Sequence, residues 1–187
     1  AAASVICSSY IIQVLVRKRL YKQSNYSRIL IGLCSVDCIS SLGGFLTTWP
    51  VPEDTPGYLY AAGTEATCRM QGFMIQVGTA SPFYNLSLAI YYMLVLKYKW
   101  SDRKIHQRVE VFLHAVPLLF GFGTATAGLP LDLYHPSLLW CWIHIPGDLQ
   151  STSDWRLYFD FAPLMSAILL ATLTMFVTTY HVWNETG

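Results

Sequence analysis

The chain has 187 residues, and its composition excludes an ordinary soluble domain. Hydrophobic residues make up 53% of the chain and charged residues only 12%, against roughly 25% charged residues in soluble domains. The formal net charge of +1 gives neither the basic surface of a nucleic-acid-binding protein nor an acidic tail. We therefore expect a protein whose main partner is a lipid bilayer, with no nucleic-acid partner.

The first apolar run covers residues 1–16 and ends abruptly at Arg17, Lys18 and Arg19. It is shorter than the roughly 20 residues that cross a bilayer. We therefore expect a first span whose outer end precedes this sequence. A signal peptide is the alternative, but its positive charge would come before the apolar run and not after it.

The next two expected spans cover residues 29–49 and 70–96. The earlier one stops at Pro50, because proline cannot continue a helix. The later one lies between Arg69 and Lys97 and contains no charge. Its length allows a tilted helix that crosses the whole membrane.

Two more apolar runs, residues 109–131 and 158–182, predict a fourth and a fifth span. The five spans leave no room for a separate soluble domain. The sequence therefore predicts an all-α fold, a polytopic bundle of membrane helices that occupies residues 1–187.

The charges predict the orientation of this bundle, because Lys and Arg are retained on the cytoplasmic side. Ten of the 12 Lys and Arg residues lie in the first and third loops. They are Arg17, Lys18, Arg19, Lys22, Arg28, Lys97, Lys99, Arg103, Lys104 and Arg108. We therefore expect these loops inside and the amino terminus outside, in a multi-pass protein of the plasma membrane. The sequons at Asn25, Asn85 and Asn184 should then carry no glycan.

This orientation distinguishes the cysteines. Cys68 begins the third span on the outer side and Cys141 lies in the outer loop before the fifth, so both face an oxidising compartment and are candidates for a disulfide. Two unpaired thiols are the alternative. Cys7, Cys34 and Cys38 lie within spans and are expected to be packing residues.

These features together resemble a seven-transmembrane G-protein-coupled receptor, with an acid in the second helix and a cysteine at the start of the third. The closer similarity is to the cyclic-AMP-receptor-like branch (class E) and the related secretin-like receptors. The residues that carry it are Cys68 with Gln71-Gly72-Phe73 and Gln76, Asn85 followed by Ala89-Ile90, His114 with Val116-Pro117, Trp140-Cys141-Trp142-Ile143, and Trp155-Arg156 before Pro163. The resemblance implies helices 1 to 5 of the receptor, with two more expected after Gly187.

The chain departs from the rhodopsin-like branch at one point. Those receptors carry an acid-Arg-aromatic triplet at the inner end of the third helix, where this chain has Tyr91-Tyr92-Met93-Leu94. We therefore do not assign it to the rhodopsin-like receptors.

Asp37 lies near the middle of the second span, where an ionised side chain is costly without a partner. The resemblance implies a polar hub that switches the bundle, with Ser81 and Asn85 of the third span as partners. The alternative is a protonated carboxyl group that bonds a backbone carbonyl. On the fourth span, His114 follows Glu110 at the helical i, i+4 spacing and is expected to pair with it.

The resemblance also implies two binding surfaces. An extracellular ligand would meet candidate residues at the outer face, which are Arg69, Gln76, Trp142 and Arg156. A heterotrimeric G protein would meet basic residues at the inner face, which are Arg17, Lys18, Arg19, Arg103 and Lys104. The two outer arginines suggest an anionic ligand such as a nucleotide, whereas the acidic outer loops suit an amine or a peptide.

The sequence therefore predicts a signalling receptor and not an enzyme, with no cofactor and no metal site. One alternative is a transporter or channel that uses Asp37 and Asn85 along a polar path, but no internal repeat supports it. Another is an intramembrane zinc hydrolase, which the histidine placement disfavours, because no two histidines have metal-ligand spacing within one helix.

Overall fold

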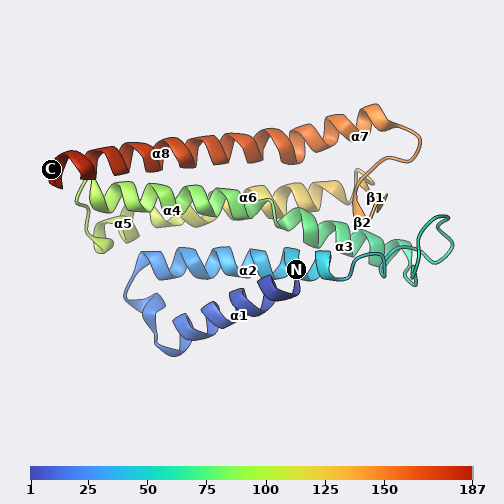
Figure 1. Cartoon of the computed structure of the whole chain (residues 1–187), viewed down its shortest axis with the longest axis horizontal. Helices are drawn as coiled ribbons and strands as arrows, with labels where there is room; N and C mark the ends of the chain where they lie inside the picture. The colour runs from blue at the N-terminus through green and yellow to red at the C-terminus, as the bar shows by residue number, and fades with distance from the viewer. Residues whose placement is uncertain (187) are drawn as a thin grey trace.

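The computed structural model describes residues 1–186 and is mostly helical. The elements in chain order are α1 (Ala2–Arg17), η1 (Leu20–Lys22), α2 (Asn25–Phe45), α3 (Glu65–Val77), α4 (Ala80–Leu96), α5 (Asp102–Arg108), α6 (Glu110–Gly128), β1 (Tyr134–Ser137), β2 (Trp140–Ile143), α7 (Leu149–Arg156), η2 (Leu157–Phe161) and α8 (Ala162–Thr186). The long helices run side by side along one axis, with the hairpin β1–β2 and α7 at one end and α5 with the carboxyl terminus at the other (Figure 1).

Three of the described helical segments are long and apolar enough to cross a membrane: Asn25–Phe45, Glu110–Gly128 and the continuous segment Leu149–Glu185. α1 is a shorter apolar helix of 16 residues. The last segment begins well before the expected residue 158, because α7 and η2 continue into α8 without a loop.

The expected third span over residues 70–96 is divided into two helices. α3 ends at Val77, and α4 starts at Ala80 after a tight turn in which the Ser81 amide donates to the Gly78 carbonyl at 2.9 Å. Pro82 explains the position of this kink, since proline has no N–H for the carbonyl four residues earlier, which is that of Gly78. Between the two helices the backbone hydrogen bonds therefore change from the i to i+4 pattern to the tighter i to i+3 pattern.

α4 is the central helix of the bundle, and it packs against α2, α6 and α8. Its buried residues Ala80, Tyr84 and Tyr91 form one hydrophobic core with residues of α2 and α6. Small residues let the helices approach closely: a Cβ added at Gly121 of α6 would lie 2.7 Å from the Cβ of Ala80. α1 packs along α2.

The hairpin β1–β2 is the one sheet in the described part of the chain, and the sequence reading did not predict it. Its antiparallel register pairs Tyr134 with Ile143 and Pro136 with Cys141. Both strands pack on α3. The fold is thus all-α apart from this short hairpin.

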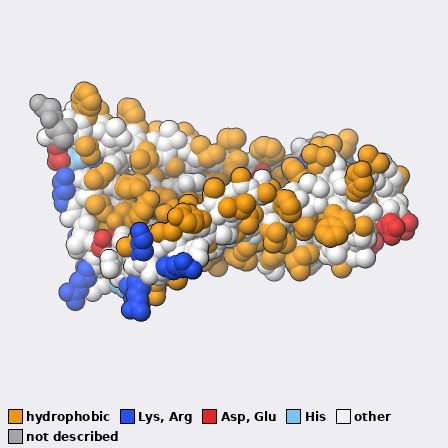
Figure 2. Space-filling view, turned by 60° about the horizontal axis from the view of Figure 1, so that its bottom comes forward, with side chains coloured by type: hydrophobic (Ala, Val, Ile, Leu, Met, Phe, Trp, Pro, Cys, Tyr) orange, Lys and Arg blue, Asp and Glu red, His pale blue; other side chains and the backbone are white. Residues whose placement is uncertain are grey.

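Lys and Arg side chains are concentrated at one end of the bundle, whereas acidic side chains lie at both ends (Figure 2). Lys and Arg side chains gather at the end that holds the η1 turn and α5 (Figure 2). Acidic side chains lie at the tip of the opposite end in the same view. The Lys and Arg residues that the sequence places in the first and third loops therefore lie together at one end of the helix axes (Figure 2).

Candidate functional site

A disulfide anchors the hairpin to α3, as the sequence predicted. Cys68 and Cys141 are bonded, with their Cα atoms 5.3 Å apart and both side chains buried. Gln71, one turn further along α3, accepts a hydrogen bond from the Cys141 amide at 2.9 Å. Its amide nitrogen donates to the carbonyls of Gly43 and Thr47 at the end of α2. Hairpin, α3 and α2 are therefore held together at one place.

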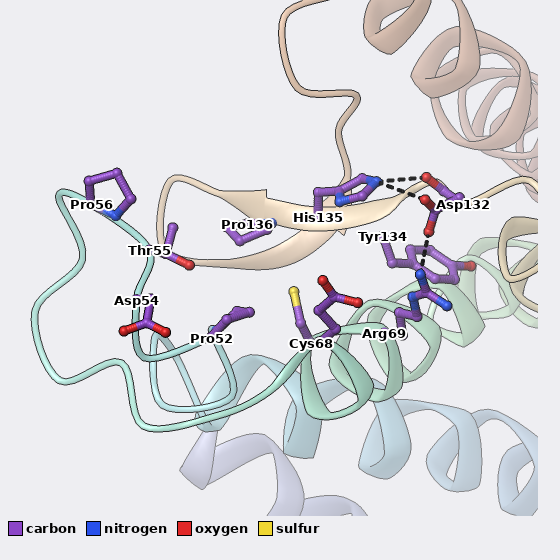
Figure 3. Close-up of a pocket in the computed structure, with 11 residues that line it drawn as sticks. Pro52, Asp54, Thr55, Pro56, Cys68, Arg69, Asp132, Tyr134, His135 and Pro136 are labelled. Carbon is purple, nitrogen blue, oxygen red and sulfur yellow. Dashed lines mark hydrogen bonds and ion pairs between the residues drawn. The ribbon is translucent and has the colours of Figure 1, made fainter.

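A pocket of about 460 Å³ opens beside this disulfide. Its walls are the loop at residues 52–56, the first turns of α3 and strand β1 (Figure 3). Carboxylates dominate its charged lining, which consists of Asp54, Glu65, Arg69, Asp132 and His135. A cavity of this size lies within the range of small-ligand sites.

Arg69 lines this pocket, but it is already paired. Its guanidinium lies 2.9 Å from the Asp132 carboxylate, and His135 contacts the Asp132 carbonyl at 2.8 Å (Figure 3). Asp54 and Glu65 have no ion-pair partner among residues 1–186. The free charge of the pocket is therefore negative, although the sequence reading considered Arg69 a cation for an anionic ligand.

The other three residues expected to face a ligand form a separate cluster. Arg156 donates from Nε to the Ile143 carbonyl at 2.8 Å and from a terminal nitrogen to Ser137 Oγ at 2.7 Å. Its guanidinium also lies 5.1 Å from the ring centre of Trp142. Gln76 is fully buried and bonded to Trp142. These residues attach the hairpin to the helices, and their contact with a ligand stays a prediction.

Asp37 bonds α1 and not α4. Its carboxylate accepts hydrogen bonds from Ser4 Oγ at 2.7 Å and Ser8 Oγ at 2.6 Å. Within residues 1–186 no hydrogen bond joins it to Ser81 or Asn85, and Asn85 is exposed. α1 covers the face of α2 that carries Asp37, so the serines of α1 reach it first. The switching role expected for these three residues stays a prediction.

A network that the sequence reading missed lies at the basic end of the bundle. Glu110, only 7% exposed, accepts hydrogen bonds from Arg28 of α2 and contacts His106 of α5. Asn25, fully buried, donates to the Asp102 carbonyl at 2.6 Å and to its carboxylate at 3.0 Å. The network fastens α2, α5 and α6 to one another.

The signal for this network was present in the sequence, because Arg28 and Glu110 are charges at the start of two apolar segments. The expected pair of Glu110 and His114 is found at 4.0 Å, a weaker contact than those with Arg28 and His106. His114 instead lies with Nδ1 at 3.4 Å from the hydroxyl of Tyr84 on α4.

The basic residues expected to face a G protein are all exposed at this end; they are Arg17, Lys18, Arg19, Arg103 and Lys104. Lys104 lies with its ammonium 4.0 Å from the ring centre of Trp100. Within the described residues no cluster of His, Cys, Asp and Glu could hold a metal ion.

Neither the models of known protein families nor the curated protein sequences include a match to this chain.

Proposed function

We propose that the chain belongs to a G-protein-coupled receptor of the cyclic-AMP-receptor-like type and forms its first five spans. In this proposal α1, α2, the kinked pair α3 and α4, α6 and the segment α7–η2–α8 cross the plasma membrane, with the amino terminus outside. The three segments of membrane-spanning length support a membrane location.

The observation that carries the proposal is the difference between the two ends of the bundle. One end has a disulfide-bonded hairpin and an acidic pocket, as suits an oxidising exterior. The other has the exposed basic residues, which suits the cytoplasmic side (Figure 2). A receptor needs such a division, because its ligand and its transducer bind on opposite sides of the membrane and influence each other through the helices between them.

The pocket favours a ligand with a cationic group, such as an amine or a basic peptide. Arg69 is paired with Asp132, while Asp54 and Glu65 present unpaired carboxylates. Arg156 is engaged by the hairpin. An anionic ligand would therefore have to displace existing partners of both outer arginines.

The test is nucleotide exchange on purified heterotrimeric G proteins in vesicles that contain the full-length protein. Cyclic AMP, tyramine and tetra-arginine serve as anionic, amine and basic-peptide probes, with empty vesicles as the control. We expect exchange above the control, stimulation by one of the cationic probes, and a severalfold loss of exchange in the double variant Arg103→Ala with Lys104→Ala.

No exchange with any G protein class would contradict the proposal. Probe-dependent solute flux without exchange would instead identify a transporter. The transcript provides an independent check, since the proposal requires two further apolar spans after an inner loop beyond Gly187.

A further inference from the structure

Gln76 contacts three other elements through one fully buried side chain. It lies in the last turn of α3, and its amide reaches the outer hairpin, α6 and the π-helical turn η2. We propose that Gln76 is a positioning residue that couples the hairpin β1–β2 to the π-helical turn η2 of the last apolar segment.

The hydrogen bonds of the Gln76 amide are the first step of the argument. Its Oε1 accepts from Trp142 Nε1 at 2.9 Å. Its Nε2 donates to Thr124 Oγ1 at 3.2 Å and to the Phe159 carbonyl at 3.1 Å. Both amide protons and the oxygen are therefore in use, and the orientation of the amide is determined by its three partners.

The Phe159 carbonyl is a special acceptor because of Pro163. In a regular helix this carbonyl would accept from the amide four residues later, and Pro163 has no N–H. The helix passes through the π-helical turn Leu157–Phe161 just before this point. Gln76 therefore supplies a donor where the proline has removed one, as neighbouring helices do for proline kinks in membranes.

Gln76 also lies at the kink between α3 and α4. Its own carbonyl accepts from the Thr79 amide at 3.0 Å and from Thr79 Oγ1 at 2.8 Å. One residue thus joins two irregular helical turns, the one before Pro82 and the π-helical turn before Pro163. A shift of either turn changes the distances between the Gln76 amide and its partners.

The hairpin end of this connection is rigid. Trp142 sits on β2 next to the disulfide of Cys141, and Arg156 holds the neighbouring Ile143 carbonyl from the end of α7. A displacement of the hairpin therefore moves the indole N–H that bonds Gln76, and through Gln76 it changes the support of the Phe159 carbonyl. That this displacement follows ligand binding rests on the proposed receptor function, but the coupling itself does not.

Backbone hydrogen–deuterium exchange of the full-length protein in lipid nanodiscs tests the coupling. Gln76→Met keeps the volume and removes all three hydrogen bonds. We expect exchange over residues 157–166 and 140–144 to rise roughly three- to tenfold, the effect of losing one or two hydrogen bonds.

Gln71→Met is the matched control, because Gln71 is an equally buried glutamine of α3 that bonds α2 and Cys141 but not η2. We expect it to raise exchange near residues 43–47 and at the hairpin while residues 157–166 stay unchanged. An equal rise over residues 157–166 in both variants would overturn the proposal, as would no rise in Gln76→Met.

Pro163→Ala gives a second, independent measurement, because it restores an N–H for the Phe159 carbonyl. In this background we expect Gln76→Met to change exchange over residues 157–166 less than twofold. If Gln76→Met raises exchange by the same factor with and without Pro163→Ala, the coupling is contradicted. If Gln76→Met does not fold, Trp142→Phe removes the indole donor alone and should still raise exchange in residues 157–166. No G protein enters these assays, so their outcome is separate from that of the nucleotide-exchange test.

Discussion

Glu110 shows how a carboxylate is accommodated at the start of an apolar helix. It is nearly buried, yet Arg28 and His106 approach it from two other helices. A buried charge is costly unless it is paired and hydrogen-bonded. The sequence predicted a partner for Glu110 on its own helix but not Arg28, which is 82 positions away and becomes a neighbour only in the fold.

We predict that Glu110→Gln lowers the free energy of unfolding by about 1–3 kcal/mol, because it leaves Arg28 without its carboxylate partner. Glu185→Gln is the control, since the ion pair of Glu185 with Lys99 is largely exposed and solvent screens it, so we expect a much smaller loss. Denaturant unfolding in detergent micelles measures both. Equal losses in the two variants would contradict the role of the network around Glu110 at the basic end of the bundle.

We expect His144 to make the end of the hairpin β1–β2 sensitive to acid. Burial lowers the pKa of His144, and the nearby positive charges of Arg156 and His135 lower it further. Because the folded-state pKa lies below the unfolded value of about 6.5, the unfolded state binds the proton first. The neutral imidazole therefore makes its full contribution to the free energy of unfolding above about pH 6.5, and this contribution is lost as the pH falls below that value.

We predict that the thermal unfolding midpoint of the wild type falls more steeply between pH 7.5 and pH 5 than that of His144→Gln. Unfolding followed by intrinsic tryptophan fluorescence measures both slopes. Identical slopes would show that His144 does not contribute to the acid sensitivity.

Two glycines leave the space in which the hairpin packs closely on the helices. A Cβ added at Gly72 of α3 would lie 2.6 Å from the ring of Tyr134, and one at Gly128 of α6 would lie 2.5 Å from its hydroxyl oxygen. That hydroxyl donates to the Ala125 carbonyl at 2.9 Å, so the ring is fixed between the two helices. α3, α6 and β1 therefore meet at one buried tyrosine.

Gly72→Ala should destabilise the protein by about 1–3 kcal/mol, because the ring of Tyr134 has no room to move away from the new methyl group. Gly123→Ala is the matched control on α6, where an added Cβ would meet no atom within 4 Å. We expect it to be neutral or to stabilise by up to about 1 kcal/mol through helix propensity. Thermal unfolding of the two variants distinguishes a local clash from a general effect of glycine replacement.

Of the five expected spans, α2, α6 and the last segment have membrane length, whereas α1 is shorter and the third is divided into α3 and α4. Apolar content located the segments because it is a local property. The kink at Gly78 follows from Pro82, which has no N–H for the Gly78 carbonyl.

The molecule as a unit has one basic end and one disulfide-bonded end, and its proposed orientation in the membrane follows from that difference. A glycosylation assay tests it. We predict that an acceptor site created in the loop at residues 46–64 by Asp54→Asn with Pro56→Thr receives a glycan, whereas the native sites at Asn25 and Asn184 do not. Glycosidase-sensitive gel shifts report both, and a glycan at Asn25 would mean that the orientation is the reverse.

The sequence by itself determined where the long apolar segments lie and that Cys68 and Cys141 are the pair to consider. Both follow from local properties: the summed transfer free energy of a segment and the position of a cysteine relative to it. Only the tertiary structure decided that Asp37 bonds Ser4 and Ser8 and that Gln76 bonds Trp142 and Phe159. Such partners lie 29 to 83 positions apart, and a buried polar group bonds whichever neighbour the packing of the helices brings within reach.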